Sequence, residues 1–356
     1  MGITSPPRLP GSPWPEITLR EAGLASDLEE RLNSALSLGA FPGFHGLLLA
    51  RKGAIAFAHF AAAPDEIWGK PLGLVQHGLN IRHDLRSITK SIVGLLYGIA
   101  LEQGKVPPPS APAHDAFPDY APLFGDPLRR RMTIGHILSM RMGIAWDEGM
   151  NYADPDNAER LMEAAPDRIR FILERPMIHR PGSVWTYCGG ATALLGHLIA
   201  KGTGQALDSF AAERLFVPLG ISDVEWIRGS DGQPAAASGL RMTPSDLARI
   251  GQLMLDGGKG IVPRPWLAQS IEPRGLVEQG IRYGYQWWIG KLVDSGKLWH
   301  AGFGNGGQRL IVIPSLDLVV VILAGNYNRT DQWKMPVNLM SRIVMPALRP
   351  KAPASS

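Results

Sequence analysis

The chain has 356 residues, of which 45% are hydrophobic, 19% are charged and one is cysteine. This length corresponds to about two domains, and the composition excludes disordered, collagen-like and coiled-coil proteins. A single cysteine excludes an internal disulfide, so the chain is not a small disulfide-linked secreted module. The net charge of +4 comes from 36 basic and 32 acidic residues spread along the chain, which argues against nucleic acid as a partner.

The sequence predicts neither a membrane span nor an export signal. Its most apolar stretch, residues 310–324, is interrupted by Pro314 and Asp317 and falls short of the roughly 20 apolar residues that a membrane helix needs. Residues 1–15 are rich in proline and lack the apolar run of a signal peptide. We therefore expect a cytoplasmic protein without a membrane partner, and the sequence leaves its oligomeric state open.

The first predicted elements are a helix, a hairpin and a second helix. Leucines recur at helical spacing within residues 26–38. Residues 44–60 are typical of a β-hairpin, because two apolar runs flank a short turn. Residues 87–103 form the clearest predicted helix, with apolar residues on one face and Gly104 after its end. Residues 106–127 contain many prolines and are expected to be mostly loop.

The middle of the chain is predicted to be mostly helical and its end mostly extended. Between about residues 132 and 268 the helical period is found in segments 134–140, 157–164, 168–174, 192–201, 206–215 and 244–256. Four consecutive strands are then expected at 283–289, 297–301, 309–313 and 318–324. A last helix, over residues 332–348, can cover the resulting sheet.

These elements predict an α/β (α+β) fold, in which helices flank an antiparallel sheet whose strands come from both ends of the chain. The sheet domain is expected to be discontinuous, built from residues 16–100 and 270–348, and a mostly helical domain is expected over residues 101–269. Residues 1–15 and 349–356 are expected to be irregular tails. The crevice between the two domains is the expected place for a site.

Three features that suggest chemistry are better explained by structure. Residues 302–307 satisfy G-x-G-x-x-G, but a β-branched run follows where a dinucleotide-binding fold needs a helix. The nine histidines show no metal-ligand spacing, so we expect them on the surface or in the core and predict neither a metal nor another cofactor. Cys188 has no histidine or aspartate partner in the sequence pattern and is expected to be a small packed residue.

Ser87 and Lys90 form an S-x-x-K motif at the start of the helix predicted over residues 87–103. A spacing of three places both side chains on one helix face. A partly desolvated lysine loses affinity for its proton and can take one from a serine hydroxyl. The N–H groups of the first turn lack helical partners, so the N–H of Ser87 can form one half of an oxyanion hole. The motif alone is common, and an ordinary helix start is the alternative interpretation.

Further motifs accompany S-x-x-K in a fixed order along the chain. They are H-D-L-R-S-I-T-K-S at 83–91, M-T-I-G-H-I-L-S at 132–139, R-P-G-S-V-W-T-Y-C-G at 180–189, P-L-G-I at 218–221, S-G-L at 238–240, S-D-L-A at 245–248 and H-A-G at 300–302. In this order they resemble the serine β-lactamase and penicillin-binding-protein superfamily, specifically its class C-like branch. That branch includes D-alanyl-D-alanine carboxypeptidases, family VIII esterases and 6-aminohexanoate-dimer hydrolases. The resemblance extends over about residues 25–345.

The resemblance implies a role for each matching residue. Ser87 would be the nucleophile and Lys90 its proton-accepting neighbour. Tyr187 matches the tyrosine of the Y-x-N motif, which activates the serine or shuttles its proton. Residues 300–302 match the K-T-G-type strand, and the following N–H of Phe303 would complete the oxyanion hole. The alternatives are a core aromatic residue at position 187 and a solvent-facing strand residue at position 300.

Gly189, His300 and Gly302 are the expected substrate-binding positions, and two of them depart from the family pattern. Gly189 stands where the motif has asparagine, so a side-chain amide is missing. His300 replaces lysine and exchanges a permanent charge for one that titrates near neutrality. Both departures disfavour efficient β-lactam hydrolysis.

The class A arrangement of this superfamily does not fit. Its E-x-x-L-N motif should follow the nucleophile, whereas the matching residues 29–33 precede Ser87, and S-D-N is absent from the sequence. Deacylation should therefore depend on Tyr187 and Lys90. The aromatic residues Tyr283, Tyr285, Trp287 and Trp288 are expected mainly to pack on the sheet, although one or two rings could line an apolar acyl pocket.

The sequence thus predicts a serine hydrolase that cleaves a small ester or amide through an acyl-enzyme on Ser87. Lys90 and Tyr187 would be its proton-transfer groups, and its expected partner is a small-molecule ester or amide substrate. Two alternatives stay open. One is β-lactamase or D-Ala-D-Ala carboxypeptidase-like activity, and the other is a catalytically silent binding protein of the same fold.

Overall fold

One large sheet forms the centre of the molecule. The computed structural model describes residues 14–149, 152, 154–278, 280–293 and 295–348. Eight antiparallel strands have the order β2-β1-β13-β12-β11-β10-β9-β8. Their bounds are β1 (Phe44–Arg51), β2 (Ala54–Phe60), β8 (Gly275–Glu278), β9 (Ile281–Tyr283), β10 (Trp288–Lys291), β11 (Leu298–Gly304), β12 (Gln308–Ile313) and β13 (Leu318–Ala324).

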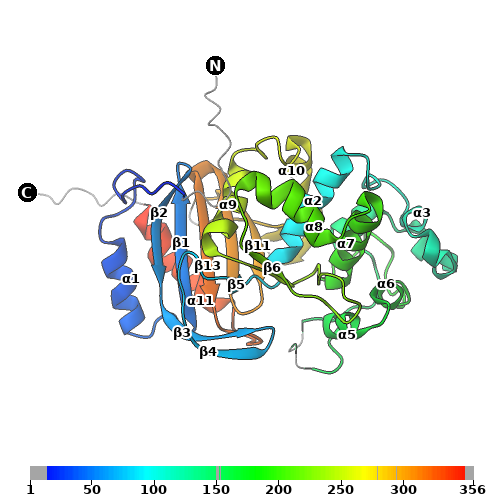
Figure 1. Ribbon diagram of the computed structural model, residues 1–356, viewed down its shortest axis with the longest axis horizontal. Coiled ribbons are helices and arrows are strands. Elements are labelled where there is room, and N and C mark those ends of the chain that lie inside the picture. Colours follow the sequence, from blue (N-terminus) through cyan, green and yellow to red (C-terminus); the bar gives the residue numbers. More distant parts are fainter. Residues whose placement is uncertain (1–13, 150–151, 153, 279, 294, 349–356) are drawn as a thin grey trace, which may run out of the picture.

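The two ends of the chain meet in the middle of this sheet. Strand β1, blue in Figure 1, lies beside the orange strand β13, with Leu47 opposite Ile322. The turn from β1 to β2 consists of Lys52 and Gly53, whose φ angles of 55° and 71° are those of a two-residue hairpin loop that matches the twist of its strands. The predicted α/β class, with an antiparallel sheet drawn from both ends of the chain, is confirmed.

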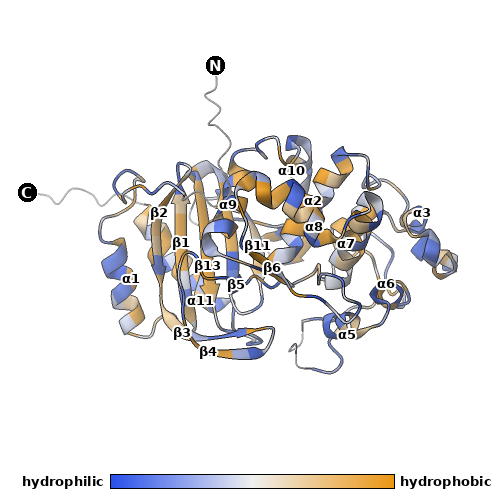
Figure 2. Cartoon of the chain, viewed as in Figure 1, coloured by the Kyte–Doolittle hydropathy of each residue, from blue (hydrophilic) through white to orange (hydrophobic). Residues whose placement is uncertain are grey.

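Helices cover both faces of the sheet, which explains why its strands are apolar at nearly every position. Along β13, Val320 and Ile322 belong to one apolar cluster, whereas Val319 and Val321 belong to a second cluster on the other face. The first cluster includes residues of α1 (Leu28–Ser37), α11 (Lys334–Leu339), η6 (Met340–Val344) and α12 (Met345–Ala347). In Figure 2 the central strands are orange, while α1 at the edge carries blue residues on its outer side.

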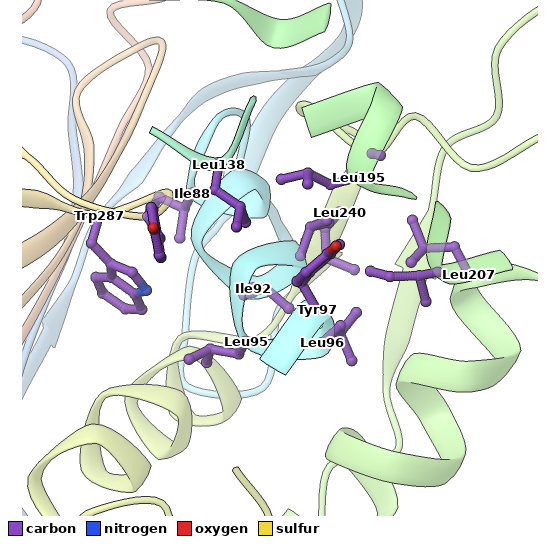
Figure 3. Close-up of a cluster of buried hydrophobic side chains, with 14 of the residues drawn as sticks. Ile88, Ile92, Leu95, Leu96, Tyr97, Leu138, Leu195, Leu207, Leu240 and Trp287 are labelled. Carbon is purple, nitrogen blue, oxygen red and sulfur yellow. The ribbon is translucent and has the colours of Figure 1, made fainter. Parts of the chain in front are cut away.

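Helix α2 (Ile88–Glu102) lies between the sheet and the helical part of the chain, beside α7 (Gly189–Thr203) and β11. Thirteen of its 15 residues are buried, which is the expected state of a helix that is apolar on all sides. Figure 3 shows Ile92, Leu95 and Leu96 of this helix packed among side chains of neighbouring elements, including Leu195 and Trp287. The most deeply embedded helix therefore carries the S-x-x-K motif at its start.

Each of the six helical segments predicted in the middle of the chain contains a helix. Helix α9 (Pro244–Leu255) packs against β12 and β13, and the division into domains at residues 100 and 269 stays a prediction. The remaining helices are α3 (Ala113–Ala116), η1 (Pro118–Gly125), η2 (Arg129–Arg131), α4 (Ile134–Leu138), α5 (Ala158–Ala164), α6 (Arg168–Leu173), α8 (Leu207–Ala211), η3 (Ala212–Phe216), η4 (Val217–Leu219), α10 (Arg264–Ser270) and η5 (Pro314–Leu316). Within the described residues, no helix combines the length and apolar character that crossing a bilayer requires.

Two small sheets were not predicted from the sequence. One is the hairpin of β3 (Ala62–Ile67) and β4 (Lys70–Gln76), and the other has the order β5-β7-β6, from β5 (His83–Asp84), β7 (Leu240–Met242) and β6 (Val224–Trp226). The strand expected over residues 283–289 is instead divided between β9 and β10. Gln286 lies between them with a φ of 63°, and its buried side chain donates to the carbonyl of Leu138. Tyr283 pairs with Trp288, so residues 284–287 form the turn of a hairpin between two neighbouring antiparallel strands.

Candidate active site

Ser87 is the residue immediately before α2, where the chain changes from strand β5 to helix. Its side chain makes no capping hydrogen bond to α2, so in the described structure its hydroxyl is not committed to holding the helix end. The preceding residue, Arg86, has a left-handed φ of 49°, a conformation that costs about 1–3 kcal/mol and is concentrated at functional sites. Ion pairs of the Arg86 guanidinium with Glu66, at 2.8 Å, and Asp84, at 3.3 Å, hold this conformation.

Lys90 lies one turn into α2 and points back at Ser87. Its Nζ donates to Ser87 Oγ at 2.9 Å and to the carbonyl oxygen of Ala237 at 3.1 Å. Lys90 is buried, with a relative exposure of 1%. The spacing of three residues thus produces the contact that the S-x-x-K motif predicts.

Two buried carboxylates lie beside the Lys90 ammonium. Nζ is 3.7 Å from Glu148 Oε1 and 3.9 Å from Glu159 Oε2. Burial alone lowers the pKa of Lys90, but Glu159, Tyr187 and Glu148 together raise this pKa above its ordinary value. The expectation that desolvation strips Lys90 of its proton is therefore wrong, because buried negative charge compensates the ammonium.

Glu148 is a site residue that the sequence analysis missed. Its Oε2 accepts hydrogen bonds from Trp146 Nε1 and from the backbone N–H of Gly189, each at 2.6 Å. Burial raises the pKa of Glu148 to about 7, although Lys90 and these two donors lower it. Residue 148 lies in a loop without a recognisable local motif, so only the fold brings it to the site.

The same carboxylates explain the glycine that replaces asparagine at position 189. A Cβ built on Gly189 would lie 3.0 Å from Glu148 Oε2 and 3.2 Å from Glu159 Cδ. The carboxyl group of Glu159 is itself held by a hydrogen bond from the hydroxyl of Ser238. The two glutamates therefore fill the space that an asparagine side chain would need. In the sequence, the glycine in place of asparagine at position 189 was the feature that could have indicated a filled space there.

Tyr187 joins Ser87 and Lys90, as the motif order predicts. Lys90 Nζ lies 4.9 Å from the centre of the Tyr187 ring. Burial raises the pKa of Tyr187, whereas the charge of Lys90 and a hydrogen bond with the Ser87 side chain lower it. The ring packs against Trp288 at a centroid distance of 5.5 Å and against Trp185 at 6.1 Å. The structure thus brings the three predicted catalytic side chains together.

Strand β11 runs past the start of α2 and carries the remaining predicted positions. A Cβ on Gly302 would lie 3.1 Å from Ile88 Cγ2 and from Ser91 Oγ, so the absence of a side chain lets β11 lie against the first turn of the helix. Phe303 lies beyond the last pairing of β11 with β10, which joins Ala301 to Trp288. The ring of Phe303 stacks on Trp288 at 5.0 Å.

His300 does not carry the titrating charge that its sequence position suggests. It is buried, and burial lowers its pKa to about 4, so the imidazole is neutral at pH 7. Its Nδ1 lacks a hydrogen-bond partner within the described part of the chain. The expectations of titration near neutrality and of a solvent-facing alternative are both wrong, because this part of β11 faces the interior.

The structure also places the residues that were expected to be structural. Cys188 is buried, and burial raises the pKa of its thiol well above the usual value, as expected for a packed cysteine. Tyr283, Tyr285 and Trp287 are buried, whereas Trp288 is half-buried beside Tyr187. Three of the nine histidines, His45, His77 and His83, are buried, within the expectation of a surface or core position, and lie together around Asp65.

Comparison with known proteins decides the family. A model of the beta-lactamase family matches residues 68–332, which is more than half of the chain. The chain belongs to the beta-lactamase family. The resemblance inferred from the ordered motifs is therefore confirmed.

Individual relatives of this beta-lactamase-family chain are distant. It is 24% identical to 6-aminohexanoate-dimer hydrolase of Paenarthrobacter ureafaciens over 270 residues, 68% of this chain and 66% of that protein. The chain spans two thirds or less of the curated relatives it matches. Among solved structures, EstCE1, a hydrolase with promiscuous acyltransferase activity, has a TM-score of 0.70 at 16% identity, covering 91% of this chain and 99% of that chain. A class C beta-lactamase from Rhodobacter sphaeroides has a TM-score of 0.67 at 17% identity, covering 91% and 100%.

Proposed function

We propose that this beta-lactamase-family protein is a serine hydrolase that cleaves small esters or amides through an acyl-enzyme on Ser87. The observation that carries the proposal is the 2.9 Å contact of Lys90 Nζ with Ser87 Oγ, with the Tyr187 phenol beside both groups. A serine becomes a useful nucleophile only when neighbouring groups take up its proton and stabilise its developing charge. The Ser87 site has both kinds of group.

In acylation, Ser87 Oγ forms a bond to the substrate carbonyl carbon, and the bond from that carbon to the leaving oxygen or nitrogen breaks. The serine proton passes to the Tyr187 phenol oxygen while the phenol's own proton passes to the leaving group, so Tyr187 stays neutral overall. Lys90 keeps its proton, consistent with its raised pKa, and stabilises the negative charge on Oγ. Water then attacks the acyl carbon, and the reverse relay returns a proton to Ser87.

The negative charge on the substrate oxygen needs a second set of donors. The backbone N–H of Ser87 precedes the first turn of α2, where N–H groups lack intrahelical partners and attract negative charge. The N–H of Phe303, on the part of β11 beyond its β10 pairing, is the proposed second donor. The close approach of Gly302 to Ile88 supports this placement, since it brings β11 to the first turn of the helix.

Small esters or amides fit the site better than β-lactams. A β-lactam carries a carboxylate, and the position that supplies a lysine in the family pattern holds the neutral His300 here. The amide side chain of the Y-x-N motif is missing at Gly189, and two carboxyl groups occupy its space, so the site lacks the side-chain amide that could bind a β-lactam's own amide. The half-buried rings of Trp185 and Trp288 beside Tyr187 offer an apolar wall for an acyl group.

Substitution of the nucleophile tests this proposal. Ser87→Ala should reduce kcat for a short-chain p-nitrophenyl ester by at least about 10⁴-fold, because the covalent route is lost. Circular dichroism should show that the variant is folded. A folded variant that keeps a tenth of the wild-type kcat would rule out Ser87 as the nucleophile, whereas a wild-type protein without hydrolytic activity would favour the silent binding protein.

A further inference from the structure

A second buried cluster of polar side chains lies in the sheet region, apart from the proposed hydrolytic residues. It consists of His45 on β1, Asp65 on β3, His77 just after β4 and His83 at the start of β5. All four residues are at most 7% exposed. One nitrogen or oxygen atom from each residue lies within 4.8 Å of those of the other three.

The hydrogen bonds around this cluster determine which ring nitrogens carry protons. His83 Nδ1 lies 3.0 Å from the carbonyl oxygen of Asp84, which can only accept, so Nδ1 carries the proton and Nε2 has a free lone pair. His45 Nδ1 lies within hydrogen-bond distance of that nitrogen, so without an ion His45 Nδ1 donates to the lone pair of His83 Nε2.

Two ring nitrogens and a carboxylate converge at this point. His45 Nδ1 and His83 Nε2 are 2.9 Å apart, and each lies 3.8 Å from one oxygen of the Asp65 carboxylate. A neutral imidazole can carry its one proton on either ring nitrogen, so His45 can turn a lone pair toward an ion when its proton moves to Nε2. The carboxylate supplies negative charge beside both rings.

His77 contributes a third imidazole that the protein leaves unsatisfied. Its ring stacks on the ring of His45 at a centroid distance of 4.1 Å. Its Nε2 is buried and has no hydrogen-bond partner among the residues that the structure describes. A buried polar atom without a partner costs free energy and needs an explanation, such as an ion at the site. An imidazole binds a metal in the plane of its ring, so rotation of the His77 ring out of this stack would direct Nε2 at an ion and remove that cost.

We propose that His45, Asp65, His77 and His83 bind one zinc ion. Three imidazole nitrogens and one carboxylate oxygen suit tetrahedral Zn²⁺, whose bonds to such ligands are about 2.0–2.2 Å long. In a tetrahedron of that size neighbouring ligand atoms are about 3.4 Å apart. The nitrogens of His45 and His83 are 2.9 Å apart, and all four candidate ligand atoms lie within 4.8 Å of one another, so the observed separations span that value. Four protein ligands fill a tetrahedral site, so its role is structural.

The surroundings of the cluster match those of a metal site. Metal-bound histidines donate their other ring nitrogen to a carbonyl or carboxylate, and ligating carboxylates are themselves hydrogen-bonded. His83 Nδ1 donates to the carbonyl oxygen of Asp84 at 3.0 Å, and the hydroxyl of Tyr327 donates to Asp65 Oδ1 at 3.0 Å. The zinc would fasten the β3–β4 hairpin and β5 to the sheet, and β5 leads directly to Ser87.

Zinc binding by the full chain is the first test. Protein stripped with EDTA should take up one equivalent of Zn²⁺, and its unfolding midpoint should rise with zinc because the ion binds only the folded site. Cobalt(II) in place of zinc should give the intense visible bands of a tetrahedral ion. Absence of stoichiometric zinc binding by the wild-type protein would overturn the proposal.

His77→Phe removes a ligand nitrogen and keeps a ring to stack on His45. It should weaken zinc binding by more than about tenfold and abolish the cobalt bands. His197→Phe is the matched control, because His197 also has a buried, unpartnered Nε2 within the described structure and stacks on Phe117, but lies outside the cluster. Tyr327→Phe, which keeps all four ligands, should weaken binding by about 10-fold or more. Unchanged zinc affinity in His77→Phe would contradict the assignment, as would an equal loss in His197→Phe.

Discussion

At the scale of single residues, the site depends on charge balance more than on any one motif. The S-x-x-K spacing brings Lys90 to Ser87, but the protonation of Lys90 follows from Glu148 and Glu159, which come from other segments. Burial disfavours the ammonium, whereas Glu159, Tyr187 and Glu148 raise the pKa of Lys90 above its ordinary value. The mechanism that we propose therefore uses Lys90 to stabilise charge and Tyr187 to move the proton.

A double-mutant cycle tests whether Lys90 and Tyr187 act as one unit. General acid–base catalysis contributes about 10²–10⁴-fold, so Tyr187→Phe should lower kcat for an ester by at least about 100-fold, and Lys90→Ala should be similarly severe. The double variant should be little worse than either single variant, because groups that act as a unit are non-additive. Steady-state kinetics on the four proteins measures the coupling. If the losses simply multiply, the two residues act independently, and charge stabilisation by Lys90 is not coupled to proton transfer through Tyr187.

The raised pKa of Glu148 predicts a pH dependence of stability. The folded protein holds a proton on Glu148 up to about pH 7, whereas an unfolded glutamate releases it near pH 4.3. The folded state thus binds more protons in this window, and its unfolding free energy should fall as pH rises from about 5 through 7. Glu148→Gln cannot lose a proton there, so its unfolding free energy should fall less steeply than that of the wild type.

Denaturant unfolding at intervals from pH 5 to pH 8.5 measures that slope. Glu29→Gln, which removes an exposed carboxylate from α1, is the control and should keep the wild-type slope. Parallel curves for Glu148→Gln and the wild type would show that Glu148 does not titrate in this range.

At the scale of elements, the approach of β11 to α2 sets the geometry of the proposed oxyanion hole. Gly302 permits this approach, since its Cβ would meet Ile88 and Ser91 at 3.1 Å. Gly302→Val should push the strand away from the helix and lower kcat/KM for an ester by about tenfold or more, because small displacements at a reacting centre are costly. The measurement is steady-state hydrolysis by folded protein. Valine is common in β-strands, so a loss of activity would not be explained by a lower strand propensity of β11.

Gly125→Val is the matched control for this substitution. No atom of the described structure lies within 4 Å of a Cβ at Gly125, so this change should leave kcat/KM at the wild-type value. Full activity of Gly302→Val would mean that the contact between β11 and α2 does not position the site.

Elements with strong periodicity were predictable from the sequence, and those defined by tertiary contacts were not. The apolar face of residues 87–103 predicted α2 to within one residue at each end. Two apolar runs on either side of a short turn predicted the β1–β2 hairpin. Strands β5, β6 and β7 have only two or three residues each, too few for a period to be visible. The predicted strand over 283–289 failed because Gln286 turns inward to hydrogen-bond with Leu138.

The same distinction applies to the site. Ser87, Lys90 and Tyr187 could be found because each lies in a short local motif. Glu148 could not, since nothing near it in sequence indicates that it will be buried beside an ammonium. The histidines of the proposed zinc site were missed for the same reason, because His45 and His83 are 38 residues apart and meet only in the folded sheet.

At the scale of the whole molecule, the fold is shared with proteins of different substrate preference, so the lining of the site has to decide the substrate. We propose that this lining includes the neutral His300, the two carboxyl groups beside Gly189 and the aromatic rings beside Tyr187. We expect kcat/KM for a short-chain p-nitrophenyl ester to exceed that for nitrocefin, which is anionic. Parallel spectrophotometric assays measure both values.

A cation at position 300 should shift this preference. His300→Lys adds the charge that the family pattern has there, so it should raise the nitrocefin to ester ratio of kcat/KM at pH 7 relative to the wild type. The ratio of the two kcat/KM values is measured on one preparation of each protein, so it does not depend on how much of that preparation is active. Nitrocefin hydrolysis equal to or faster than ester hydrolysis by the wild type would favour a β-lactamase.

The most direct test of the account is the covalent bond itself. Intact-protein mass spectrometry after treatment with a fluorophosphonate should show one adduct per chain, and peptide mapping should place it on Ser87. Ser87→Ala should remain unlabelled under the same conditions, since the reagent reports an activated serine. An unmodified wild-type protein, or an adduct on another residue, would contradict the acyl-enzyme mechanism proposed for this chain.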